Sequence, residues 1–461
     1  MFDPTLAAFR FGFGLPLPQE APQSQAQMLA ALDQPDVMAH RFTGPTTAVL
    51  APLRAEAQKA ERDTRRTRDS ANRAEAKAAA ELWRKLSRDL AKSGAQAAKS
   101  MLARAVETPD GLRERLVWFW ANHFSTTAPD RRTLAVPMTL IDEAIRPHLT
   151  APFAQMLTAA TLHPAMLDYL DQSRSIGPHS RRGSRNAKGL NENLARELLE
   201  LHTMGAGSGY AQTDVQELAE LLTGVTTGPG GMEFDPDRAE PGAERVLGRT
   251  YGSDAPADLG PIRAFLADIA TRPETARFVT GKLAVHFLGP TLGTKAAPDL
   301  ARVWVATGGN LKAVVTALIQ SPHAWTAGAE NIRRPAEFLV AACRALGLSG
   351  AQVARMGDGP FQRLLLQPME KMGQPFGGPP GPDGWTEDPA YWITPQGMTT
   401  RILWATLVPG RLVQPLPDPA TVMARALGPR ASAALIWAVP RADSPRQAVG
   451  LIFAAPEFNR R

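Results

Sequence analysis

Apolar residues recur at spacings of three and four along most of the chain after residue 110, as they do on one face of an α-helix. Alternation of apolar and polar residues is scarce, and its best example is the stretch ERVLGRTY at 244–251. Glycine and proline gather at 224–260 and 375–395, which predicts two long loops, and ordered loops of that length often line a site. The pattern predicts an all-α fold, a large multi-helix domain with long Gly/Pro-rich loops.

Residues 51–107 follow a different pattern, rich in Ala, Arg, Lys and Glu and free of proline after Pro52. This composition favours long exposed helices with opposite charges at helical spacing. A basic arm for nucleic acid is the alternative, but the acidic residues interleave with the basic ones, which favours a solvated, charged helical hairpin. We therefore expect a Pro/Gly-rich segment at 1–50 that packs on the main domain, a hairpin insertion at 51–107, and a main all-α domain at 108–461.

Composition narrows the classes of function. A chain of 461 residues, with 44% hydrophobic and 21% charged residues, has the make-up of an ordinary soluble globular protein with a large core. Its net charge of +6 is weak evidence for a nucleic-acid partner, and none is expected. The single cysteine, Cys343, excludes an intramolecular disulfide and a thiolate metal cluster. The N-terminus lacks a signal-peptide pattern and no stretch approaches about 18 apolar residues, so a cytoplasmic protein without a membrane span is expected.

The stretch GLNENLARELLELHTMG combines carboxylates, an arginine and a histidine within one predicted helix. At about 100° per residue, Asn191 and His202 fall on the side of the leucines, so the imidazole is predicted to face the core. Glu192 and Glu197 flank this apolar stripe, and Arg196 lies further round. A histidine beside carboxylates could act as a general base or bind a metal. The alternative is a hydrogen-bonded core histidine surrounded by ion pairs.

Two neighbouring stretches supply further candidates. HSRRGSRNAKGL places Arg181, Arg182 and Arg185 just before the N-terminus of that helix, where free amide groups attract anions. A mobile basic surface loop is the other interpretation, because two glycines interrupt the stretch. VWFWANHFST ends an apolar helix with Asn122 and His123, which could form the wall of a pocket if the two histidines meet in space. Otherwise these aromatic residues belong to the core and carry one polar cap.

Several familiar chemistries are excluded by the sequence. It contains no Gly-x-Ser-x-Gly elbow, no Walker loop and no Cys-x-x-Cys pair. FDPDRAEPGAE begins like a calcium-binding loop but lacks the oxygen ligand and the glycine required in its middle. No strong metal-binding motif is present either, so the sequence leaves metal and cofactor undetermined.

A series of motifs in fixed order identifies a resemblance to a known family. Along the chain these are FGFG, WANHF, HPAMLDYLDQSRSIGP, GLNENLARELLELHTMG, GYAQTDVQELAELLTG, RVLGRTYG, RRPAEFLVAACRALG, GQPFGGPPGPDGW and APEFNRR. Over nearly its whole length the chain resembles the bacterial domain of unknown function 1800 (DUF1800) family. The resemblance implies a largely helical fold, a signature helix at 191–202, and frequent encoding beside a sulfatase-like secreted protein. Many relatives look exported, and relatives tend to have a histidine and a lysine where this chain has Ala239 and Glu244.

Two hypotheses about function follow. The first is a polar pocket around the signature helix that binds a small anionic ligand or a metal and could transform it, with the histidine as base or ligand and the arginines as anion contacts. The second is a non-catalytic partner or maturation factor for a sulfatase-like protein, which presents the charged hairpin and the 375–395 loop. The candidate catalytic residues are His202, Glu192, Glu197 and His123, and the candidate ligand-binding residues are Asn191, Arg181, Arg182, Arg185, Arg196 and Asn122.

Overall fold

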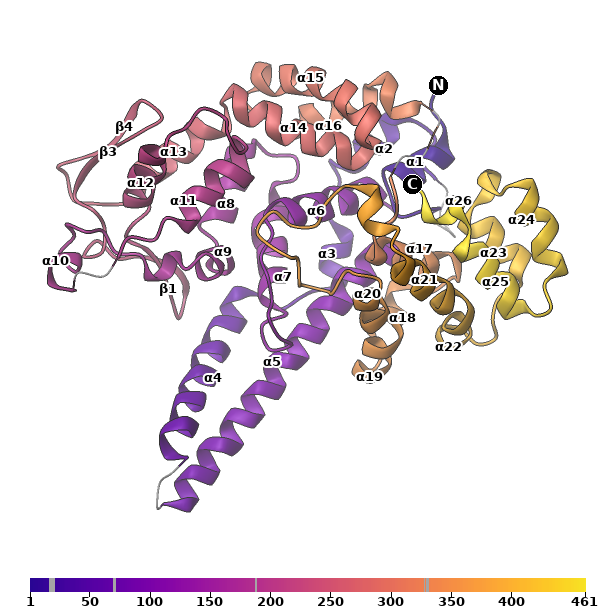
Figure 1. The fold of residues 1–461 in the computed structure, drawn as a ribbon, viewed down its shortest axis with the longest axis horizontal. Coiled ribbons are helices and arrows are strands. Elements are labelled where there is room, and N and C mark those ends of the chain that lie inside the picture. The colour runs from indigo at the N-terminus through magenta and orange to yellow at the C-terminus, as the bar shows by residue number, and fades with distance from the viewer. Residues whose placement is uncertain (16–20, 69–71, 187–188, 327, 329–330) are drawn as a thin grey trace.

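The fold is predominantly helical, as predicted, with two small two-stranded sheets among the described residues. Figure 1 shows the two β-hairpins at one end of the molecule, the C-terminal helices at the other, and a long helical hairpin that projects from the body. No helix within the described ranges is long and apolar enough to cross a membrane. The structure is a computed structural model that describes residues 1–15, 21–68, 72–186, 189–326, 328 and 331–461.

The N-terminal segment forms three short helices. Each begins after a residue whose side chain accepts a hydrogen bond from an amide of the first turn, and these N-caps are Asp3, Ser24 and Asp36. The helices are α1 (Pro4–Arg10), α2 (Gln25–Ala31) and α3 (Val37–Arg41).

The charged segment forms a helical hairpin that projects from the body (Figure 1). Its outer faces carry exposed ion pairs at helical spacing, such as that between Arg65 and Glu61 at 2.8 Å. Between the two helices lies a small apolar core of Ala57, Ala60, Leu86 and Leu90. The helices are α4 (Thr47–Thr67) and α5 (Arg73–Glu107).

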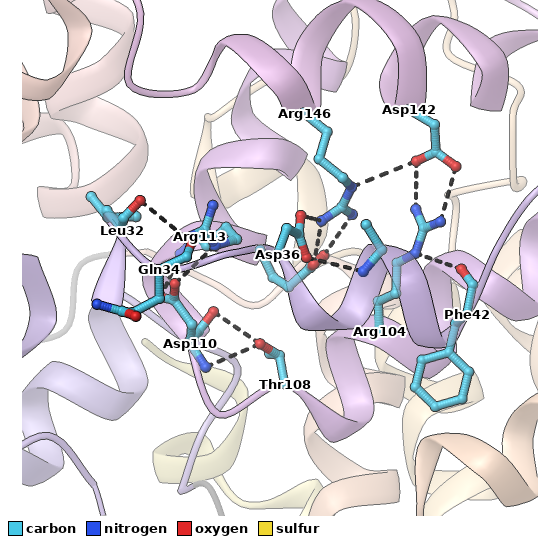
Figure 2. Close-up of polar contacts among 12 residues, drawn as sticks. Leu32, Gln34, Asp36, Phe42, Arg104, Thr108, Asp110, Arg113, Asp142 and Arg146 are labelled. Atoms are coloured by element: carbon cyan, nitrogen blue, oxygen red, sulfur yellow. Dashed lines mark hydrogen bonds and ion pairs between the residues drawn. The ribbon is translucent and has the colours of Figure 1, made fainter. Parts of the chain in front are cut away.

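Ion pairs fasten the N-terminal segment and the base of the hairpin to the body (Figure 2). The Arg146 guanidinium contacts Asp36 at 2.8 Å and Glu114 at 2.6 Å. Arg104 of α5 contacts both oxygens of Asp142, at 2.5 and 3.0 Å. Because paired arginine and carboxylate groups are largely buried here, removing one partner would leave an uncompensated charge. This network therefore holds the base of the hairpin at a fixed place.

The central helices surround α6 and include the signature helix. Between some of them lie π-helical and 3-10 segments, η1 (Ile141–Ile145), η2 (Arg146–His148), η3 (Gln172–Arg174) and η4 (Leu198–Thr203). The α-helices of this part are α6 (Gly111–His123), α7 (Val136–Leu140), α8 (Phe153–Thr161), α9 (Pro164–Tyr169), α10 (Gly183–Asn186), α11 (Asn193–Glu197) and α12 (Gln212–Leu221).

The expectation of one long irregular loop at 224–260 is wrong, because this segment contains two β-hairpins. Strands β1 and β2 pair antiparallel, and so do β3 and β4, in which the stretch predicted to be strand-like lies. Leu247 and Gly248 turn the second hairpin with positive φ angles of 51° and 80°, which suits a tight two-residue turn. The strands are β1 (Val225–Gly228), β2 (Gly231–Phe234), β3 (Gly242–Val246) and β4 (Arg249–Ser253).

The remaining helices build the upper layer and the C-terminal part. Many of them begin with proline at the first helical position, where the missing N–H costs nothing and the fixed φ angle suits a helix. They are α13 (Gly260–Ala270), α14 (Pro273–Leu288), α15 (Pro290–Thr307), α16 (Leu311–Gln320), α17 (Pro335–Ala345), α18 (Gly350–Ala354), α19 (Asp358–Phe361), α20 (Gln367–Lys371), α21 (Pro395–Leu407), α22 (Pro409–Leu412), α23 (Pro419–Ala426), α24 (Ala433–Ala438), α25 (Pro445–Ala454) and α26 (Pro456–Asn459), with η5 (Pro322–Trp325), η6 (Gln362–Leu366), η7 (Pro389–Trp392), η8 (Gly428–Arg430) and η9 (Val439–Arg441).

Two clusters of buried apolar side chains form the core. The first takes its members from Ala7 to Ala324, and the second draws mainly on residues 336–458. Trp118 of α6 and Phe376 of the loop after α20 pack against both clusters. The two cores therefore meet at α6 and this loop, and ligand pockets are common at such junctions.

Candidate functional site

The signature helix is not a uniform α-helix. α11 continues as the π-helical segment η4, in which Thr203 Oγ1 donates to the Leu198 carbonyl at 2.6 Å. Such segments are rare and frequently occur at functional positions. His202 lies in η4 with none of its surface exposed, which confirms that it faces the core. Asn191 instead anchors the start of the helix, because its amide donates to the Leu170 carbonyl at 3.1 Å.

His202 and His123 meet in space, as the pocket hypothesis required. His123 Nε2 donates to the His202 carbonyl oxygen at 3.1 Å, and the two ring centroids are 6.2 Å apart. Burial lowers the pKa of His202 to about 3, and the nearby Lys282 charge lowers it further. Burial also holds the pKa of His123 well below its usual value. Neither ring nitrogen of His202 has a hydrogen-bond partner in the described part of the chain, so both imidazoles are neutral and enclosed.

The two glutamates predicted to assist His202 contact other groups. Glu192 accepts hydrogen bonds from Arg196 at 3.0 Å and from a glutamine of α12 at 2.8 Å. Burial raises the pKa of the half-buried Glu197, and the neighbouring Glu200 charge raises it further. Among the described contacts, none joins either carboxylate to the buried imidazole. Glu192 and Arg196 therefore belong to a surface network of the signature helix.

The basic residues before the signature helix also have partners on the surface. Arg181 pairs with Asp237 at 3.4 Å, and Arg182 pairs with Asp235 at 2.9 Å. Arg185 is exposed on α10, at the edge of the molecule away from α6 (Figure 1). The structure thus separates these three arginines from Asn122 and His123, although the sequence suggested that all could face one ligand.

A cavity of about 110 Å³ lies where the two apolar cores meet. Its apolar wall includes Trp118, Met138, Leu140, Ile141, Met369 and Phe376. Its polar side includes Asn122, Thr126, His286, Arg334, Glu337 and Gln374. Of the sequence candidates, Asn122 lines this cavity, whereas the rings of His123 and His202 do not.

The loop at 373–388 closes one side of the cavity and is fixed there by Asn122. The Asn122 amide nitrogen donates to the Trp385 carbonyl at 2.9 Å, and its amide oxygen accepts from the Trp385 amide at 2.7 Å. Gly384 permits this approach, since its φ is 76° and a Cβ there would lie 2.4 Å from the Asn122 carbonyl oxygen. The loop residues that line the cavity are Gln374, Pro375, Phe376, Gly377, Pro379 and Trp385.

Glu387, near the end of this loop, organises the polar side. Its carboxylate lies 2.6 Å from His286 Nδ1 and 2.5 Å from a guanidinium nitrogen of Arg334. The Arg334 charge and the His286 contact hold the pKa of Glu387 well below its usual value despite its partial burial. Because an ionised carboxylate can only accept, His286 Nδ1 carries the hydrogen of this contact. Burial lowers the pKa of His286 to about 4, so the imidazole is neutral at pH 7.

Glu337 lies behind Glu387 as the second carboxylate of the site. It contacts Arg115 and Arg461, each at 2.9 Å. These two guanidinium groups overcome the effect of burial and lower the pKa of Glu337 to about 2. Three buried arginines thus face two carboxylates, the buried Glu337 and the partly exposed Glu387, around a neutral histidine. These five charged groups sum to one positive charge, and of them Arg334 and Glu337 line the cavity itself.

Four residues that line the cavity carry a buried polar atom without a hydrogen-bond partner among the residues that the structure describes. These atoms are Trp118 Nε1, Thr126 Oγ1, His286 Nε2 and Arg334 Nε. Buried polar groups in folded proteins are nearly always hydrogen-bonded, and an unmade bond costs about 1–3 kcal/mol. Other described residues also carry such atoms, but these four belong to one cavity, where a bound molecule, water or an organic ligand, could supply their partners.

A separate group of carboxylates could hold a cation. One oxygen each of Glu217, Glu220 and Glu244 lies within 4.8 Å of the others. Burial and the contact with Glu217 raise the pKa of Glu244 to about 8. Carboxylate oxygens suit hard divalent cations such as Ca²⁺ or Mg²⁺, but this group of α12 and β3 does not line the cavity above, and its member Glu244 lines a different hollow.

The comparisons with known proteins give one match. The model of a family described as "Protein of unknown function (DUF1800)" matches residues 7–460. No curated protein and no solved structure matches the chain.

Proposed function

The chain belongs to the DUF1800 family over nearly its whole length, and we propose that it binds a small organic anion in the cavity between α6, α17 and the 373–388 loop. The observation that carries this proposal is that four residues lining one cavity each carry a buried polar atom without a partner among the described residues. The sequence suggested a binding site on the signature helix, and this proposal places the site on the neighbouring helix α6 instead. The ligand class, a small anion, stays as the sequence suggested.

Charge and shape both support a small anion with an apolar part. Arg334 on the polar side and Trp118 on the apolar wall each offer an unpartnered N–H group, and together with the arginine charge they favour an acceptor such as a carboxylate. The opposite wall is apolar, with Met138 and Ile141 among its members. The cavity of about 110 Å³ is smaller than the roughly 150 Å³ cavity that holds benzene, so its ligand should have no more than about six non-hydrogen atoms.

The two buried histidines have a positioning role in this proposal. His123 follows Asn122 on α6, and its hydrogen bond to the His202 carbonyl holds the end of α6 against the π-helical segment. Asn122 in turn holds the loop that closes the cavity. The signature helix would therefore act on the ligand site through α6.

Filling the cavity is expected to abolish binding without unfolding the protein. Ala121 lines the cavity from α6, and the leucine of Ala121→Leu would occupy much of its volume. We expect the affinity for propanoate, measured by titration calorimetry, to fall at least about tenfold, a loss of about 1.4 kcal/mol. Alanine and leucine have similar helix propensities, so α6 should persist.

Ala301→Leu is the matched control, since Ala301 is also a half-buried helical alanine but packs elsewhere, on α15. It should keep the affinity of the unmodified protein. Equal propanoate affinity in all three proteins, or no propanoate binding by the unmodified protein at millimolar concentrations, would argue against an anion site in this cavity.

A role as partner of a sulfatase-like protein is the second candidate, and the projecting hairpin favours it. The distal halves of α4 and α5 are largely exposed and point away from the body (Figure 1). A long charged projection of this kind offers a partner protein a binding surface without changing the packing of the core.

Replacing residues 60–82 by a short Gly/Ser turn is expected to leave folding and propanoate binding unchanged, because the base of the hairpin and its ion pairs remain. If the hairpin carries the partner surface, co-purification with a co-expressed sulfatase-like protein of the same genome should fall by about tenfold or more. Unchanged co-purification would contradict this second role.

A further inference from the structure

The tautomer of His286 restricts what the cavity can bind. Its Nδ1 donates to the ionised Glu387, so the neutral ring has its lone pair at Nε2. Nε2 is buried and has no donor among the described groups, and His286 lines the cavity. Thr126, which also lines the cavity, carries a hydroxyl, but that oxygen has no partner either and so does not reach Nε2. Since no described group supplies the missing hydrogen, a molecule bound in the cavity would have to donate it.

The other unpartnered atoms have the opposite requirement. Trp118 Nε1 and Arg334 Nε each carry a hydrogen and need an acceptor. A simple carboxylate satisfies these two donors but leaves His286 Nε2 unmet. A molecule that satisfies the whole set offers an acceptor and a donor hydrogen close together.

We propose that this site selects small hydroxy acids, the carboxylate facing Trp118 and Arg334 and the hydroxyl donating to His286 Nε2. This inference rests on the proposed function and deepens it by naming the ligand class. A 2-hydroxy acid has its carboxylate and hydroxyl on adjacent carbons, so both can be met within a cavity of about 110 Å³. A site that buries an acceptor for a hydroxyl discriminates strongly against the analogue without it, because that acceptor is then left unpaired.

Lactate and propanoate differ only by this hydroxyl and provide the test. Titration calorimetry of the full-length protein with each lactate enantiomer and with propanoate should give an affinity at least about tenfold higher for one lactate enantiomer. His286→Phe removes the acceptor and should bring lactate to the affinity of propanoate. Trp118→Phe removes one carboxylate donor and should weaken both acids by a similar factor, with the lactate preference retained.

The outcomes separate this inference from the proposed function. Equal affinities of the unmodified protein for lactate and propanoate, both lost in Ala121→Leu, would overturn hydroxyl selection and leave the anion site standing. No binding of either acid would overturn both and assign the unpartnered atoms to water. If His286→Phe does not fold, the ratio of lactate affinity to propanoate affinity is still measured in the unmodified protein and in Trp118→Phe. A ratio near one overturns the inference.

Discussion

Replacing Glu337 with alanine is expected to lower the unfolding free energy by about 3–5 kcal/mol, the range for removing one partner of a buried ion pair. Glu337 is 3% exposed and compensates two buried guanidinium groups, those of Arg115 and Arg461. Without it, both stay buried beside Arg334, and burial already lowers the pKa of Arg115 to about 9. Urea unfolding at pH 7, followed by circular dichroism, measures the loss.

The matched control is Glu192→Ala, which also removes a paired glutamate. Glu192 is about one-third exposed, and exposed pairs contribute only about 0–1 kcal/mol. A loss of comparable size in the two variants would contradict the view that the Glu337 network is a buried structural element of the cavity.

The same contacts predict how acid acts on Glu337. Its pKa in the folded protein, about 2, lies below the ordinary value of 4.5, so the unfolded state binds the proton more readily. The stability that Glu337 contributes is fully present above pH 4.5 and is lost as the pH falls towards 2. Between pH 4.5 and the onset of acid unfolding, the unfolding free energy of Glu337→Ala should therefore fall less than that of the unmodified protein.

Helical periodicity was sufficient to predict the fold class and the orientation of single side chains. The position of His202 among leucines predicted a core-facing imidazole, and it has no exposed surface. The sequence left open whether His123 meets His202, and in the structure the two ring centroids lie 6.2 Å apart. The π-helical course of η4 was not predictable, since its residues have ordinary helix propensities and tertiary packing decides the hydrogen-bond pattern.

The polar side of the cavity could not be predicted because its charges come from distant parts of the chain. His286 stands alone in an apolar run, Glu337 looks like an ordinary first-turn acid of α17, and Glu387 lies in a loop. Arg461 reaches them from the other end of the sequence. Spacing within one segment carries no information on such a cluster. The one usable signal was the ordered loop before Glu387, which was expected to line a site.

The β-hairpins were missed for a related reason. Positions 224–260 are rich in glycine and proline, which usually indicates loops, but several of these glycines have positive φ angles at hairpin turns, as Gly231 and Gly248 do. Strands of four or five residues give too short an alternation to stand out.

His202→Phe is expected to make the protein more stable in mild acid. His202 stays neutral when folded because its pKa is about 3, whereas in the unfolded chain it takes up a proton near pH 6.5. A depressed pKa of a basic group favours unfolding below pH 6.5, so the stability of the unmodified protein falls as the pH decreases towards 3. At pH 5 this one residue costs about 2 kcal/mol, and phenylalanine removes that cost.

At pH 8 the substitution should change the unfolding free energy by less than about 1 kcal/mol, because no described hydrogen bond to the ring is lost and the His202 carbonyl still accepts from His123. Urea unfolding of both proteins from pH 8 to pH 5 measures the difference, with His40→Phe, at an exposed position of α3, as the control for the loss of one histidine. Parallel pH profiles for the unmodified protein and His202→Phe would show that His202 accepts a proton in the folded state, as a general base open to solvent would. A divergence of about 2 kcal/mol in unfolding free energy by pH 5 would instead show that the imidazole is enclosed and has a structural role next to α6. His286 would then be the histidine available to a ligand.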